Sequence, residues 1–234
     1  MEPYQEFALL YDELMNDIDY KSWYEYIKEI FKKYNKNPKT ILEMACGTGN
    51  LTEYFCEDGY NITAFDISED MLSITYNKLD KFKNLSILKQ DMVNLNLGSK
   101  KFDIIICACD SMNYITSEDD LKKVFENAYK YLNDGGMFIF DINSYYKLKN
   151  IIGNNTFVQD TEDIFYVWEN EFLEDEEICN FYLSFFVNEE GLYRRFDEHH
   201  IERAYKTDVI KDYLLEAKFK EVYIYEDFKF SEPS

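Results

Sequence analysis

Polar or glycine-rich turns follow nearly every apolar run in residues 1–150. The first run leads into Glu43–Asn50, and the later runs end at Asp66, Asp91-Met92, Cys109-Asp110-Ser111 and Asp141. In an open parallel sheet, ligands bind at the carboxyl ends of the strands, near the point where the strand order reverses. We therefore expect these residues to surround one ligand.

The turn after the first run is built from small residues. Ala45, Gly47 and Gly49 let a ligand approach the backbone closely. A dinucleotide-binding turn has the pattern G-x-G-x-x-G, which is incomplete in the register that starts at Ala45 and in the one that starts at Gly47. Glu43, inside the run, is unfavourable beside phosphates and favourable near a cationic ligand. The turn therefore favours a positively charged ligand without a diphosphate.

Acidic residues at the next two strand ends complete a site for a nucleoside. Asp66 stands where a carboxylate can accept hydrogen bonds from both hydroxyls of a ribose. Asp91 offers an acceptor for an exocyclic amine, beside the Met92 thioether, which can pack on a purine face. A nucleoside with a positive charge and no phosphate satisfies this set, and S-adenosylmethionine is such a ligand.

The patterns that carry these turns alternate between strand and helix. Residues 6–34 show helical spacing, with Asp19 or Ser22 as a cap, and the run of residues 102–109 is apolar on both faces, as a central parallel strand requires. Ser68 and Ser117 are predicted to cap the helices that follow them. The fifth strand is predicted at 137–143, after the segment NDGG ends the preceding helix. Five alternations of strand and helix predict a doubly wound, mostly parallel, Rossmann-like α/β sheet.

The rhythm changes after residue 150. Residues 163–172, 178–188 and 192–205 alternate polar and apolar, which predicts antiparallel strands joined by acidic hairpins. Thr207 is then predicted to cap a last helix to Ala217, and residues 221–230 read as one more strand. The expected organisation is a cofactor-binding domain with N-terminal helices at 1–150, an inserted antiparallel β cap at 151–206, and the last helix and strand of the first domain at 207–234.

The motifs E-x-A-C-G-T-G, a second-strand acid, Q-D-M, F-D-x-I and a Cys-Asp-Ser turn together resemble the class I S-adenosylmethionine-dependent methyltransferase family, over about Tyr11–Asp141. Y-D-x-L-M, E-H-H-x-x-R-x-Y and the strand cap are more similar to a small-molecule subgroup that includes N,N-dimethyltransferases of nucleotide-linked amino sugars. Two features depart from the family pattern. Ala45 stands where the family often has glycine. The family usually closes its sheet with a hairpin of strands six and seven, whereas this sequence offers one predicted strand before FSEPS.

The resemblance implies roles for individual residues. Gly47 and Gly49 would approach the methionine end of the cofactor, and Tyr11 would close over its sulfonium. Asp66 would hold the ribose, and Asp91 with Met92 the adenine. The residues predicted to bind the cofactor are Tyr11, Glu43, Ala45, Cys46, Gly47, Gly49, Asp66, Ile67, Met71, Asp91, Met92, Cys109 and Ser111.

In-line methyl transfer from such a cofactor needs mainly alignment and exclusion of water. The sequence has no Ser-His-Asp spacing and no His/Cys cluster for a metal. A nitrogen nucleophile must also lose a proton, so His200, Asp110 and Tyr11 form the predicted catalytic set. His199 and His200 are adjacent on a predicted strand and face opposite sides, and periodicity does not select the one that faces the site.

The composition indicates which classes of partner and which cellular compartment to expect. The chain has 234 residues, with 25 basic and 46 acidic side chains and a net charge of −21, which disfavours nucleic acid and anionic membranes. The expected partner is a small-molecule nitrogen or oxygen acceptor, amines included. Five cysteines without a disulfide pattern, and no signal peptide, predict a cytoplasmic protein. The alternatives are a nicotinamide-dependent oxidoreductase, a non-catalytic nucleoside-binding module and a nucleic-acid methyltransferase.

Overall fold

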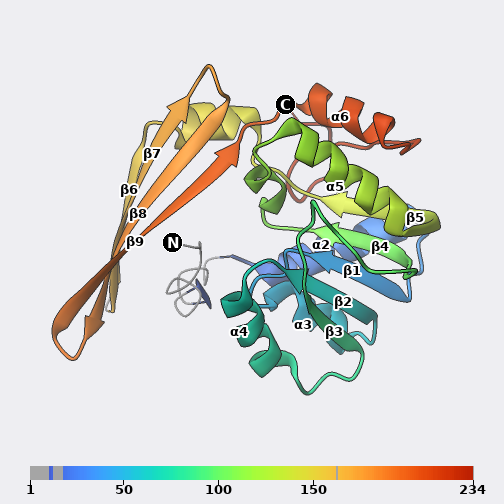
Figure 1. Ribbon diagram of the computed structural model, residues 1–234, viewed down its shortest axis with the longest axis horizontal. Coiled ribbons are helices and arrows are strands. Elements are labelled where there is room, and N and C mark those ends of the chain that lie inside the picture. The colour runs from blue at the N-terminus through green and yellow to red at the C-terminus, as the bar shows by residue number, and fades with distance from the viewer. Residues whose placement is uncertain (1–10, 13–17, 162, 234) are drawn as a thin grey trace.

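The computed structural model describes residues 11–12, 18–161 and 163–233 and contains two β-sheets (Figure 1). Within the described residues, the first sheet is parallel, with the strand order β3-β2-β1-β4-β5. Its strands are β1 (Thr40–Met44), β2 (Asn61–Asp66), β3 (Leu85–Lys89), β4 (Phe102–Cys107) and β5 (Leu132–Phe140). The order reverses between β1 and β4, so the doubly wound sheet expected from the sequence is confirmed.

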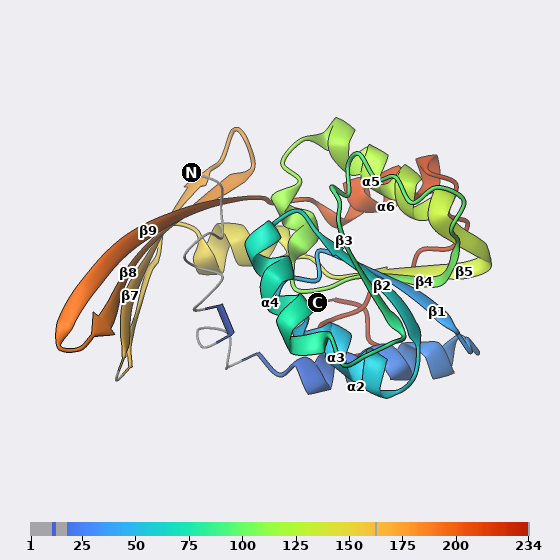
Figure 2. The same cartoon turned by 60° about the horizontal axis from the view of Figure 1, so that its bottom comes forward.

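Helices cover both faces of this sheet (Figure 2). They are α2 (Tyr20–Lys33), α3 (Asn50–Glu57), α4 (Glu69–Leu79), α5 (Glu118–Tyr131) and α6 (Thr207–Glu216). Alternate residues of β1 point to opposite faces: Ile41 packs with α2 and α3, and Leu42 packs with α5 and α6. The core therefore consists of two apolar layers on either side of a buried sheet.

Three helix starts agree with the sequence. The side chains of Asp19, Ser68 and Ser117 accept hydrogen bonds from backbone N–H groups in the first turns of α2, α4 and α5. The predicted cap of the last helix is wrong, because Thr207 is already helical and Lys206 stands at the cap position without a side-chain hydrogen bond.

The cap is an antiparallel sheet that stands beside the parallel one (Figures 1 and 2). Within the described residues its order is β6-β7-β8-β9, formed by β6 (Thr156–Asp160), β7 (Ile164–Leu173), β8 (Ile178–Glu189) and β9 (Leu192–Arg203), and the π-helix η2 (Lys147–Ile152) leads into it. The sequence predicted β7, β8 and β9 and missed β6, which is short and has apolar residues side by side rather than alternating.

Two further expectations are wrong. The residues from 221 to 230, expected as a strand, form no strand; they run along α2, where the Tyr26 hydroxyl donates to the Lys229 carbonyl (2.6 Å) and Trp23 packs on Phe228. Strand β5 begins at Leu132 and ends at Phe140, not at residues 137–143. The NDGG segment lies inside it as an irregularity, because Phe102 pairs with Leu132 and Ile104 with Met137.

In the described part of the chain, no helix is long and apolar enough to cross a membrane.

Candidate active site

A cavity of about 2690 Å³ runs from beneath the cap across the carboxyl ends of the parallel strands, and it continues along β5 and residues 218–228 as far as Lys36 and Lys101. It is lined by every residue that the sequence proposed for binding or catalysis except Gly49. Gly49 has a φ of +79°, and an added Cβ would come within 2.8 Å of Thr75 Cγ2 and 2.9 Å of Leu79 Cδ1. The structure therefore gives this glycine a packing reason, the close approach of α4.

The turn after β1 presents its backbone to the cavity. Ala45 and Gly47 have φ values of +53° and +54°, in the left-handed region that costs an ordinary residue ~1 kcal/mol. The Cys46 N–H donates to the Phe65 carbonyl (3.0 Å), which ties the turn to β2. A Cβ on Gly47 would meet no atom within 4 Å, so the space beside this turn is open to a ligand.

Asp66 joins the glycine turn to the end of β2. Its carboxylate accepts hydrogen bonds from the Gly47 N–H and the Ser68 N–H, both at 2.9 Å. Burial raises the pKa of Asp66. Ile67 beside it is 62% exposed and lines the cavity. The end of β2 thus offers a fixed carboxylate next to an apolar surface.

The adenine end was expected at Asp91 and Met92. Asp91 Oδ1 accepts from the Val93 N–H (2.8 Å), and its Oδ2 accepts from the Asn94 side chain (2.7 Å). Both residues line the cavity. Asp91 therefore shapes the turn after β3 as well as facing the cavity.

Glu43 is a buried carboxyl beneath the glycine turn. It is 3% exposed, and burial raises its pKa to about 7. Among the described residues, its Oε2 atom has no hydrogen-bond partner. Because an unpaired buried carboxyl is costly, this oxygen suits a cationic group of a bound ligand.

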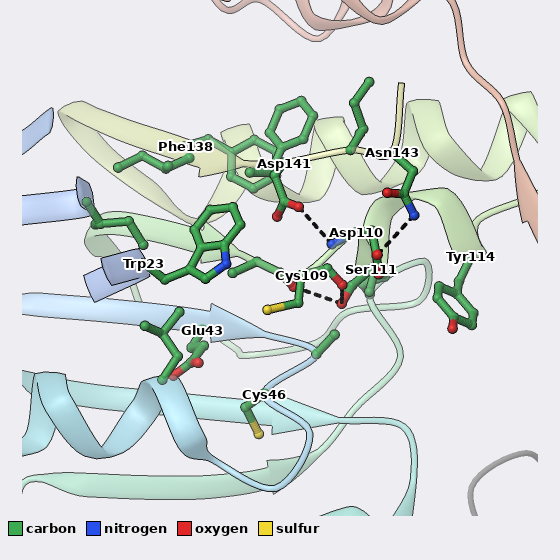
Figure 3. A pocket seen from close by; sticks show the side chains of 18 of the residues that line it. Trp23, Glu43, Cys46, Cys109, Asp110, Ser111, Tyr114, Phe138, Asp141 and Asn143 are labelled. Atoms are coloured by element: carbon green, nitrogen blue, oxygen red, sulfur yellow. Dashed lines mark hydrogen bonds between the residues drawn. The ribbon is translucent and has the colours of Figure 1, made fainter. Parts of the chain in front are cut away.

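Two half-buried carboxyl groups, Asp110 and Asp141, also lie together at the ends of β4 and β5 (Figure 3). Cys109 and Asp110 have φ values of +59° and +52°, and the Asp110 N–H donates to Asp141 Oδ2 (2.9 Å). Burial and the neighbouring Asp141 charge raise the pKa of Asp110 to about 7, and burial raises that of Asp141 to about 6. The Ser111 hydroxyl donates back to the Ala108 carbonyl (3.0 Å). This turn therefore holds acidic groups that bind protons more readily than exposed ones.

The cap contributes one histidine to the cavity. His200 on β9 is 5% exposed and lies edge-on to the Tyr114 ring, with 6.0 Å between centroids. Burial, the largest cause, lowers its pKa to about 4, so the ring is neutral at pH 7. His199 faces the other side, where it stacks on Tyr182 and contacts Asn180 Oδ1 (3.0 Å). His200 is thus the histidine that faces the site.

Tyr11 reaches the cavity from the N-terminal segment. It packs on the cluster of Met71, Ile164 and Phe185, which spans α4 and the cap. The next residue, Asp12, accepts hydrogen bonds from Thr48 Oγ1 (2.5 Å) and Lys78 Nζ (2.6 Å). These bonds hold Tyr11 beside the glycine turn.

Sequence reasoning missed three polar residues of this cavity. Glu202 lies on β9 two residues from His200, so strand alternation placed it on the same face. Asn143 follows β5, and Trp168 comes from β7; neither carried a signal that could have distinguished it. Trp168 Nε1 is buried without a hydrogen-bond partner among the described residues, and all three side chains line the cavity.

An open parallel sheet with this strand order, a glycine turn after β1 and an acid ending β2 defines a nucleoside-binding α/β protein. A family model described as a methyltransferase domain matches residues 41–136. A Bacillus subtilis (strain 168) protein described as "Putative methyltransferase YqeM" is 32% identical over 231 residues, which cover 99% of this chain and 92% of that protein. The chain belongs to the class I S-adenosylmethionine-dependent methyltransferases.

Two solved structures support this placement. The crystal structure of an S-adenosylmethionine-dependent methyltransferase from Clostridium acetobutylicum ATCC 824 has 46% identity and a TM-score of 0.82, covering 92% of this chain and 87% of that one. The sugar N-methyltransferase KedS8 from Streptoalloteichus sp ATCC 53650 shares the fold, with a TM-score of 0.75 and 17% identity, covering 90% and 83% of the two chains. This protein is therefore an enzyme that uses S-adenosylmethionine, rather than a nicotinamide-dependent oxidoreductase.

The residues present fit this cofactor. The open space beside Gly47 admits a ligand close to the backbone, and the unpaired Glu43 oxygen offers a partner for a cationic group. The two other binding groups expected from the sequence, Asp66 and the Asp91-Met92 pair, line the same cavity.

Proposed function

We propose that this methyltransferase acts on a small molecule with a nitrogen or oxygen nucleophile, and that the favoured acceptor is an amine that arrives as a cation. One observation carries the proposal. The polar lining of the cavity between the parallel sheet and the cap includes the carboxyl groups of Asp110, which is half-buried, and of Glu202, which is 2% exposed. Carboxyl groups withdrawn from water favour a cationic ligand, and the net charge of −21 disfavours a nucleic-acid polymer as the acceptor.

The apolar lining supports the same acceptor class. Tyr166, Phe181 and Phe185 line this part of the cavity, and aromatic faces attract cations. The buried indole N–H of Trp168, which has no partner among the described residues, could be satisfied by an oxygen on the acceptor. The favoured acceptor thus combines an ammonium group with an apolar body and a hydrogen-bond acceptor.

The cofactor roles implied by the family resemblance are part of this proposal. Glu43 and Gly47 would hold the methionine end, Asp66 the ribose, and Asp91 with Met92 the adenine. When bound, S-adenosylmethionine supplies a methyl group that its sulfonium charge already activates. Tyr11, held by the bonds of Asp12, would close this region from the N-terminal side and exclude water.

The protein's remaining tasks are alignment and removal of a proton. An acceptor held between the cap and the end of β4 would have its nucleophile directed toward the glycine turn. Asp110 is ionised to a substantial extent at neutral pH because its pKa is about 7, so it can receive a proton from an ammonium group. His200 is neutral there, and it would orient the acceptor and keep the site free of a competing cation.

Transfer of an isotopically labelled methyl group tests the proposal. The enzyme is incubated with labelled cofactor and a panel of primary and secondary amines, small alcohols and phenols, and total RNA, and products are identified by mass spectrometry. We expect label in one or more amines, and much less label with the cofactor-site control Asp66→Ala when the cofactor is below its saturating concentration. Label confined to RNA would refute a small-molecule acceptor, and label confined to hydroxyl compounds would refute the amine.

A further inference from the structure

Two carboxyl groups accept hydrogen bonds from one side-chain amide, and the three residues come from elements that are distant in sequence. Asn143 Nδ2 donates to Asp110 Oδ2 at 2.9 Å and to Glu202 Oε2 at 2.8 Å. Asp110 follows β4, Asn143 follows β5, and Glu202 lies on strand β9 of the cap. The Asn143 NH2 group thus donates one hydrogen to each carboxyl, and both carboxyls accept.

A second asparagine fixes this arrangement. Asn113, which is fully buried, accepts a hydrogen bond from the Asn143 N–H (2.8 Å) and donates to the Asn143 carbonyl (3.0 Å). It also donates to the Arg203 carbonyl on β9 (2.9 Å). The backbone on both sides of the bridge is thus locked, so Asp110 and Glu202 keep their relative position.

The charges around the pair are predominantly negative. Asp141 faces it from the end of β5, and Lys147 of η2 is the positive group whose field reaches both carboxyls. His200 lies on the same face of β9 but is neutral at pH 7, because burial lowers its pKa. Buried acids in such surroundings hold a proton or pair with a cation.

We propose that Asp110 and Glu202, positioned by Asn143, form a two-carboxyl anchor that binds the acceptor's ammonium group and takes its proton. The inference rests on the proposed amine acceptor and adds Glu202 and Asn143 to the machinery. Asp110 and Glu202 contact the acceptor and are catalytic residues in this scheme, whereas Asn143 is a positioning residue.

The proton balance of the anchor is simple. The empty pair holds a proton, which leaves to solvent when the ammonium group binds and favours the ionised pair. One N–H bond of the ammonium then breaks, its proton forms an O–H bond with a carboxylate of the pair, and the electron pair stays on nitrogen. The nitrogen is now neutral and nucleophilic, and the pair is protonated again, as it was before binding. The one proton that the turnover releases is the one that left for solvent when the ammonium group bound.

The Asn143 side chain is itself the probe for a test without any acceptor. Its NH2 group contacts both carboxyls, so the NMR shifts of its two protons, followed against pH in the whole protein, report the protonation of the pair. We expect two coupled steps, the lower with a midpoint near 7 because burial and Asp141 raise the pKa of Asp110 to about 7. A pair that has already lost both protons when the pH reaches about 5, as ordinary carboxyls have, would overturn the proposal.

Single amide variants assign the steps. Glu202→Gln keeps an acceptor for Asn143 and should leave one step. Asp110→Asn should also leave one step, and it should lie at lower pH than the Glu202 step of the wild type, since the Asp110 charge raises the pKa of Glu202. The matched control is Asp197→Asn, an exposed carboxyl on the outer side of the same strand, which should leave both steps unchanged. Independent titrations that no variant shifts would overturn the pair.

Cation binding forms the second arm. Tetramethylammonium chloride should move the lower midpoint to more acid pH than sodium chloride at equal concentration, by about one unit if it binds near Asp110. An unchanged midpoint would overturn the ammonium anchor. The two proposals can fail separately. Label found only in hydroxyl acceptors would refute the amine acceptor. A carboxyl pair that is fully ionised at about pH 5 would refute the anchor and leave methyl transfer to amines standing.

Discussion

We expect cofactor recognition to depend most on Asp66. Its carboxylate is already oriented by two backbone N–H groups, so it can accept hydrogen bonds from ribose hydroxyls without reorganisation. Asp66→Ala should weaken binding of S-adenosylhomocysteine about 10- to 100-fold, the effect of losing hydrogen bonds to a charged group. Isothermal titration calorimetry measures this, with exposed Asp197→Asn as the control. Equal affinity in wild type and variant would contradict the role.

Asp110 gives the protein a stability that depends on pH. Its pKa is about 7 in the folded state, against an ordinary value of 3.8, so between those values the folded state binds more protons than the unfolded state. Raising the pH through this window therefore destabilises the fold, and the loss is complete above pH 7. Asp110→Asn removes the effect.

The expected result is a difference that grows with pH. From pH 4 to pH 7, the free energy of unfolding of Asp110→Asn should rise relative to wild type by up to about 4 kcal/mol, since one pKa unit corresponds to 1.36 kcal/mol. Urea denaturation at several pH values measures it. A difference that stays constant with pH would show that the Asp110 pKa is ordinary in the folded state.

At the scale of elements, the glycine turn and α4 are fitted to each other through Gly49. Gly49→Ala places a methyl group in a left-handed backbone, 2.8 Å from Thr75, and should cost about 2 kcal/mol or more of unfolding free energy. Gly59→Ala is a matched control, because Gly59 has a φ of +82° and open space around a Cβ, so only the backbone cost of about 1 kcal/mol applies. Equal losses in the two variants would refute the packing role.

The elements predicted well from the sequence are those whose signal is local. Strand β4 is apolar on both faces, and Ser68 and Ser117 cap helices through their own first turns, so spacing sufficed. Residues 221–230 alternate like a strand, yet they pack on α2 through Trp23 and Tyr26, a tertiary choice that periodicity does not contain. The same limit applied to the site: strand-end acids were predictable, whereas the bridge from Asn143 to Glu202 joins elements far apart in sequence.

At the scale of the whole molecule, Asn113 connects the cap to the parallel sheet. Asn113→Ala removes hydrogen bonds to Arg203 on β9 and to Asn143. Amide hydrogen exchange in β9 should therefore increase by tenfold or more, a change that corresponds to about 1.4 kcal/mol in local opening. Asn127→Ala, which loses two bonds to Met92 and Val93 inside the parallel domain, should leave exchange in β9 unchanged. Similar exchange in β9 for both variants would mean that Asn113 does not hold the cap.

We propose that the loops at the carboxyl ends of this sheet bind the adenosine and methionine parts of the cofactor. A crystal structure of the protein with S-adenosylhomocysteine tests it most directly. We expect ribose hydroxyls within hydrogen-bond distance of the Asp66 carboxylate, the methionine end beside Gly47 and Glu43, and the purine next to Met92. Ligand density elsewhere, or none over Asp66 at saturating ligand, would contradict it.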